Sequence, residues 1–177
     1  MSLSAPHPLW RTAGSSPTKV VMATVQARFL SGRYRTEALC RHWSQNTGGL
    51  CKLSPDCTVK EDTDHILRVC TALDQTRKNL MNFTESYCSS HPVIASLVQK
   101  YCTQRCRLHV QFLIDCSVLP DVIAAVQKYG ETILSHLFNI SRIWVYSLHR
   151  DRLKKLGRWR NFAVILVTIY QTLFAQL

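Results

Sequence analysis

The chain has 177 residues, 46% of them hydrophobic, so it can bury a core in one domain or in a small domain with an appendage. It carries 22 Lys+Arg against 11 Asp+Glu, and the resulting net charge of +11 favours a polyanionic partner such as RNA or DNA; a solvated basic surface is the alternative. The start of the sequence has no apolar run, so we expect no secretory signal and an intracellular protein with reduced cysteines.

Apolar residues recur at helical spacing along most of the chain, which predicts a mainly α fold with few or no strands. The organisation we expect is a loose N-terminal arm, basic helices with a Cys/His-rich segment, a helical tail domain and an apolar C-terminal segment. These divisions fall at residues 1–18, 19–72, 73–160 and 161–177.

Helix boundaries are indicated by proline, glycine and capping residues. The predicted helices cover residues 19–30, a short stretch from 37, and then 64–69, 73–88, 92–101, 107–116, 120–130 and 131–156. The sequence does not decide whether short strands form near residues 51–59. Residues 162–177 carry no charge but are fewer than the roughly 20 that a spanning helix needs, so a core or interfacial segment is favoured over a membrane span.

Three cysteines and one histidine lie close together in the stretch GLCKLSPDCTVKEDTDHILRVC, at Cys51, Cys57, His65 and Cys70. A structural zinc ion takes four tetrahedral nitrogen and sulfur ligands, so these residues are interpreted as a CCHC-type zinc knuckle with no open position for a catalytic water. The interval between the first two cysteines is wide for such a site. A turn at residues 54–56 is expected to fold it back.

His65 and Cys70 can bind the same ion only under one condition on the local helix geometry. In an ideal helix, Cys70 lies about 140° around the axis from His65, so both can bind one ion only if the helix ends or bends there. Asp62 or Thr63 is the predicted N-cap of that helix. Cys40 is a reserve ligand, and disulfides or unrelated buried thiols are the alternatives to metal.

Two basic segments are candidate nucleic-acid contacts. The first mixes cations that can clamp phosphates with an aromatic ring that can stack on a base or pack inward, and consists of Arg28, Arg33, Tyr34, Arg35 and Arg41. The second places Arg150, Lys154 and Arg158 at a spacing of four on one helix face. It is either a phosphate-binding stripe or a helix end whose cations suit the helix dipole.

The order of these blocks resembles a known family. The run ARFLSGRYRTEALCRHWS, the two cysteines and KEDTDHILRVC are similar to the zinc-binding segment that follows the polymerase domain in reverse transcriptases of non-LTR retrotransposons. The resemblance extends over about residues 7–160, although more residues separate the first two cysteines than the family usually has. The matching residues are Arg28, Ser31, Gly32, Cys51, Cys57, Glu61, Thr63, His65 and Cys70.

The resemblance implies a transposable-element protein segment that grips template RNA or target DNA, with the rest of a reverse transcriptase as a further partner and a nuclear location. No Tyr-x-Asp-Asp sequence or carboxylate block for Mg²⁺ occurs, so we expect no enzyme activity, no small-molecule substrate and a C-terminal fragment of the parent polymerase. A zinc-stabilised protein-interaction module and a non-functional retrotransposon remnant are the alternatives.

Overall fold

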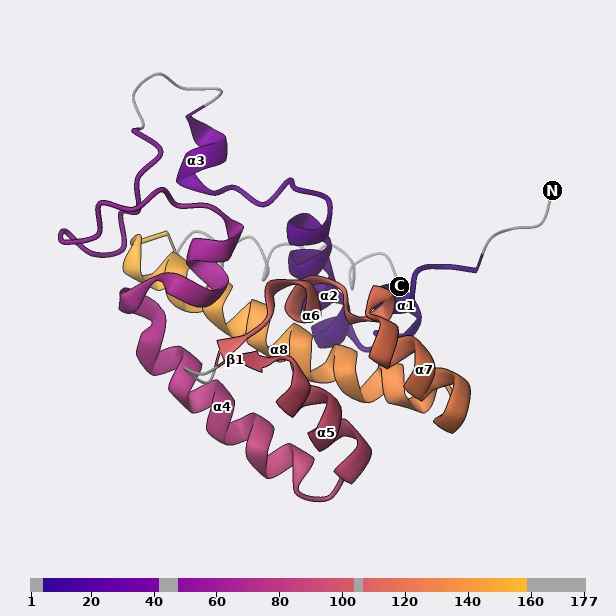
Figure 1. Cartoon of the computed structure of the whole chain (residues 1–177). Coiled ribbons are helices and arrows are strands. Elements are labelled where there is room, and N and C mark those ends of the chain that lie inside the picture. Colours follow the sequence, from indigo (N-terminus) through magenta and orange to yellow (C-terminus); the bar gives the residue numbers. More distant parts are fainter. Residues whose placement is uncertain (1–4, 42–47, 104–106, 159–177) are drawn as a thin grey trace.

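The computed structural model describes residues 5–41, 48–103 and 107–158 (Figure 1). Within these ranges the chain is mainly α, which confirms the predicted fold class. The elements in chain order are α1 (Pro8–Arg11), α2 (Pro17–Leu30), α3 (Glu37–Cys40), η1 (His65–Val69), η2 (Thr71–Leu73), α4 (Asp74–Cys88), α5 (Pro92–Lys100), β1 (Cys102–Thr103), β2 (Arg107–Leu108), α6 (Val110–Ile114), η3 (Cys116–Val118), α7 (Pro120–Tyr129) and α8 (Thr132–Lys155).

Helix α8 is the centre of the fold. In Figure 1 it crosses the molecule, and α2, α4, α6 and α7 pack against it. Its apolar residues recur every three or four positions, and Leu137, Trp144 and Leu148 are completely buried. The Trp144 indole N–H donates a hydrogen bond of 2.8 Å to Thr84 Oγ1 on α4, so the largest core side chain also satisfies its one polar group.

Local signals explain where the helices begin and end. Pro17, Pro92 and Pro120 each occupy the first turn of a helix, where proline's missing N–H costs nothing. Gly130 follows α7 with φ of 90°, a backbone conformation that side chains other than glycine rarely adopt. The predicted boundaries of α2, α4, α5, α7 and α8 therefore agree with the structure to within about two residues.

Two local predictions were wrong. The segment before residue 18 is not a loose arm in its described part, because α1 buries Leu9 to 1% exposure and His7 Nε2 lies 3.3 Å from Asp115 Oδ2. Residues 107–109 do not begin a helix, because β2 pairs with β1 as an antiparallel hairpin before α6 starts. Elements this short, four residues in α1 and two in each strand, contain too few apolar residues to show a helical or alternating pattern in the sequence.

Some predictions lie outside the described residues. They concern the end of the short helix expected from residue 37, whose buried side was predicted to include His42 and Trp43, and the apolar segment 162–177. In the part of the chain that is described, no helix is both long and apolar enough to cross a lipid bilayer.

Candidate metal centre

The loop from residue 49 to residue 61 forms a narrow hairpin-like arch that carries two of the four candidate ligands. Cys51 N–H donates to Val59 O at 2.9 Å, and Glu61 N–H donates to Gly49 O at 3.0 Å. Gly49 has φ of 71°, and a Cβ there would lie 3.3 Å from Arg41 Cδ, so this crossing point favours glycine. The two ends of the loop therefore lie side by side, and Glu61 O accepts the N–H of Ala38 in α3 at 3.1 Å.

The extra residues between the two cysteines fold as predicted. Cys57 N–H donates to Ser54 O at 3.1 Å, which closes a four-residue turn with Pro55 at its second position. This turn brings Cys57 back toward the base of the arch. The wide cysteine spacing is therefore compatible with a shared ligand site.

A π-helical turn, η1, meets the geometric demand on the second pair of ligands. Its defining bond runs from Cys70 N–H to His65 O at 2.7 Å, five residues back, and the helix ends at Val69 with Cys70 as its C-cap. Asp62 Oδ1 accepts the N–H of His65 at 2.9 Å and so supplies the cap predicted from the sequence. Because a π-helical turn contains more residues than an α-helical turn, the side chains of His65 and Cys70 lie on the same side of the helix axis.

The four side chains converge on one point. Cys51 Sγ lies 3.7 Å from Cys70 Sγ, Cys57 Sγ lies 3.5 Å from His65 Nε2, and all four ligand atoms lie within 4.8 Å of one another. Three of these residues are buried, and Cys57 is half-buried at the rim. This cluster could hold a metal ion. Cys40 is not among its members.

Backbone and side-chain donors hold the ligands in place. Leu53 N–H points at Cys51 Sγ, at 3.5 Å. The buried guanidinium of Arg77, on α4, donates to the carbonyl oxygens of Cys70 and Ile66 and so fastens η1 to the helix that follows it. The ligands are therefore held by hydrogen bonds that belong to the fold.

Burial controls protonation in the cluster. It raises the pKa of the Cys51 thiol to about 12 and raises that of Cys70, because a thiolate is poorly solvated there. Burial lowers the pKa of His65, which favours the neutral imidazole that a metal ion requires. A metal ion that binds here must therefore displace protons from Cys51 and Cys70 but not from His65.

A buried ion pair ties the arch to α8. Glu61 is completely buried, and its carboxylate accepts hydrogen bonds from Arg152 Nη2 at 2.5 Å and Nε at 3.3 Å. The same carboxylate accepts the backbone N–H of Glu37 at 2.9 Å, at the start of α3. One side chain thus joins the arch, α3 and α8.

Tyr34 belongs to this network, which corrects its assignment as a nucleic-acid contact. It is 5% exposed, its ring stacks on Phe29 with centroids 3.6 Å apart, and its hydroxyl lies 2.8 Å from His149 Nδ1. The Arg152 guanidinium lies 5.6 Å from the ring centroid. The ring faces the core and is not available to stack on a base.

The other predicted basic contacts divide into two groups. Arg28, Arg33, Arg35 and Arg41 are all exposed around the end of α2 and the flanks of α3. Arg150 and Lys154 are exposed on α8, but Arg158 leaves their stripe because α8 ends at Lys155. Arg158 instead pairs with Glu37 at 3.7 Å.

The roles of Arg152 and Arg77 were not predicted from the sequence. A signal for Arg152 was present: it lies four residues after the buried Leu148, at a position where α8 otherwise carries core residues. A cation at such a position requires a buried partner. Arg77 lay in a polar stretch of α4 that gave no comparable signal.

In comparisons with known proteins, no family model, curated protein or solved structure matches the chain.

Replacing Arg152 by methionine is expected to destabilise the protein by about 3–5 kcal/mol, because it leaves the Glu61 carboxylate buried and unpaired. Denaturant unfolding measures this cost. Arg150→Met is the matched control on the exposed face of the same helix, with an expected change of about 0.5 kcal/mol or less. Adding Glu61→Gln to Arg152→Met should recover part of the loss. Equal stability of the two arginine variants would contradict the structural importance of the pair.

Stability is expected to fall as the pH drops from about 6.5 to about 4, because burial, then Arg152 and Arg28, lower the pKa of His149 to about 4. In this interval the unfolded chain takes up a proton on His149 and the folded chain does not. The loss is at most about 3 kcal/mol. His149→Gln should remove this component, which appears as the difference between the two urea-unfolding profiles across pH. Parallel profiles would show that His149 is not buried in its neutral form.

Proposed function

We propose that this protein binds zinc through Cys51, Cys57, His65 and Cys70 and binds nucleic acid through the exposed arginines beside that site, without catalysis of its own. The observation that carries the proposal is the convergence of the four ligand atoms, two of them in a loop that packs against the exposed Arg41. In this interpretation the protein is a zinc-knuckle module similar to the region after the polymerase domain of non-LTR retrotransposon reverse transcriptases.

Zinc is favoured over other metals by ligand type and by distance. Thiolate and imidazole ligands select zinc over hard cations such as Mg²⁺ or Ca²⁺. At tetrahedral corners with ordinary zinc–ligand distances, two sulfurs lie about 3.8 Å apart and a sulfur and a nitrogen about 3.5 Å apart. The Cys51–Cys70 and Cys57–His65 separations are 3.7 and 3.5 Å. The widest ligand pairs, within 4.8 Å, would close by about 1 Å on binding.

The basic surface depends on the same site for its position. Arg41 packs against Gly49 in the arch, and Ala38 N–H donates to Glu61 O at 3.1 Å, so α3 and its flanking arginines are held by the loop that carries the ligands. Arginine guanidinium groups bind phosphate oxygens in pairs of hydrogen bonds. With the net charge of +11, this arrangement supports contact with a phosphate backbone rather than with base edges.

Metal content is the first test. We expect about one zinc ion per chain in the purified protein, lost in Cys57→Ser and in His65→Ala, and both variants should unfold at a lower temperature than the wild type. Cys40→Ser is the control, because this half-buried cysteine lies outside the cluster. Atomic absorption and thermal unfolding measure both properties. A folded wild-type protein without metal that also fails to take up added zinc would refute the metal centre.

Salt dependence tests the second half of the proposal. Arg33→Gln combined with Arg35→Gln should weaken binding to a single-stranded oligonucleotide and reduce the slope of log affinity against log salt by about 1.4, the value for two lost phosphate contacts. Lys128→Gln, an exposed cation on α7, should leave the slope unchanged. A zinc-loaded, folded protein that shows no salt-dependent binding would favour the protein-interaction module instead.

A further inference from the structure

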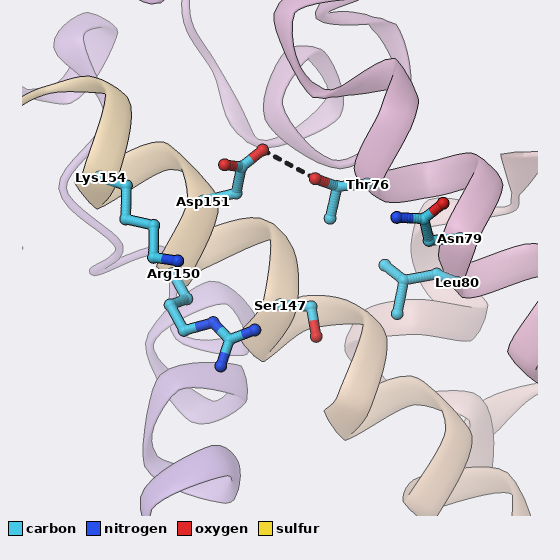
Figure 2. Close-up of a pocket in the computed structure, with 7 residues that line it drawn as sticks. All are labelled: Thr76, Asn79, Leu80, Ser147, Arg150, Asp151 and Lys154. Atoms are coloured by element: carbon cyan, nitrogen blue, oxygen red, sulfur yellow. Dashed lines mark hydrogen bonds between the residues drawn. The ribbon is translucent and has the colours of Figure 1, made fainter.

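A groove between α4 and α8 carries both cations of the α8 stripe (Figure 2). It holds a cavity of about 290 Å³, close to the lower limit for sites that bind small ligands. Leu80 contributes the apolar part of its wall, and Asn79, Arg150 and Lys154 are exposed at its mouth. No aromatic ring lines it within the described residues, so it offers nothing on which a base could stack.

Hydrogen-bond donors dominate this groove. Arg150 and Lys154 have only N–H groups to offer, and Ser147 adds a hydroxyl between them and α4. Asn79 Oδ1 accepts a hydrogen bond of 3.0 Å from Gln75 Nε2, which fixes the amide so that its nitrogen faces the groove, as Figure 2 shows. Donors spread along one groove match the oxygens of a sugar–phosphate backbone.

Asp151 is the single acidic residue among those that line the groove. Its Oδ2 accepts the hydroxyl of Thr76 at 2.7 Å, which holds the carboxylate against α4 (Figure 2). Its Oδ1 is a second acceptor in the same groove. A carboxylate repels phosphate, but it is the preferred acceptor for a ribose hydroxyl, as in dinucleotide-binding sites.

We propose that this groove binds the sugar–phosphate backbone of a single RNA strand. Arg150 and Lys154 bind a phosphate, Asn79 and Ser147 donate to its oxygens, and Asp151 accepts a hydrogen bond from the adjacent ribose 2′-hydroxyl. The inference rests on the proposed nucleic-acid function and goes beyond it, because it names the polymer and a second binding surface away from the arginines around α3. DNA lacks the 2′-hydroxyl and would meet only the repulsion of Asp151.

The test compares fluorescently labelled oligouridylate with the oligodeoxyuridylate of equal length, which differ only in the 2′-hydroxyl. Zinc-loaded protein is titrated into each, and the ratio of the two affinities is measured. Asp151→Asn removes a negative charge, so electrostatics alone would strengthen the binding of both polymers equally. The proposal instead predicts that binding of DNA strengthens while binding of RNA does not, and the preference for RNA falls by about tenfold, the value of a lost charge-assisted hydrogen bond.

Arg150→Gln and Lys154→Gln should each weaken the binding of both polymers several-fold. Lys78→Gln is the matched control, because this exposed cation lies on α4 outside the groove. Thermal unfolding establishes that every variant is folded.

Three outcomes would count against the proposal. If the groove variants and Asp151→Asn bind as the wild type does, while Arg33→Gln combined with Arg35→Gln binds more weakly, this inference fails and the proposed function stands. If the wild type binds neither polymer, both fail; equal strengthening of both polymers by Asp151→Asn refutes the sugar contact.

Discussion

The ion pair between Glu61 and Arg152 is the interaction on which the described structure depends most. It joins the loop that carries two cysteines to the last turns of the central helix, across 91 positions of sequence. Buried charges of this kind contribute little net stability compared with apolar packing, but they are costly to leave unmatched. Only a docking of the arch on α8 that keeps Glu61 and Arg152 together avoids this cost. The buried network of Tyr34, His149 and Arg152 extends this constraint to the end of α2.

In small metal-binding modules the ion often both stabilises the fold and brings its own ligands together; in this protein the fold itself positions the ligands. In an isolated zinc finger the ion supplies most of the folding energy, since the segment has no core of its own. Here the arch and η1 also rest on α8 and α4 through Arg152 and Arg77, and Ile66 and Leu67 are fully buried. The ligand atoms converge because both the local turns and the surrounding helices hold them. An ion bound there would reinforce a site that the fold has already brought together.

The sequence was informative where short-range rules decide the structure. Proline at helix starts and apolar periodicity located most helices, and ligand chemistry found all four members of the cluster. Long-range contacts were not accessible in this way. Nothing local distinguishes a Tyr34 that stacks on Phe29 from one that faces solvent, and only the arrangement of α2 against α8 decides between them. The strands at Cys102–Thr103 and Arg107–Leu108 were not predicted for a related reason: two-residue strands are too short to show an alternating pattern of apolar and polar residues.

The π-helical turn at His65–Val69 sets how this segment can change in evolution. Its hydrogen bond from Cys70 N–H to His65 O brings both ligands to the same side of the turn, and Ile66 and Leu67 between them are buried in the core. Substitutions among those intervening residues alter packing without moving the ligands, whereas one inserted or deleted residue rotates Cys70 by about 100° around the helix axis. In related chains the number of residues between this histidine and cysteine should therefore be more constant than their identity. The turn at Ser54–Cys57 carries no such restriction, because a loop can change length while its ends stay in place.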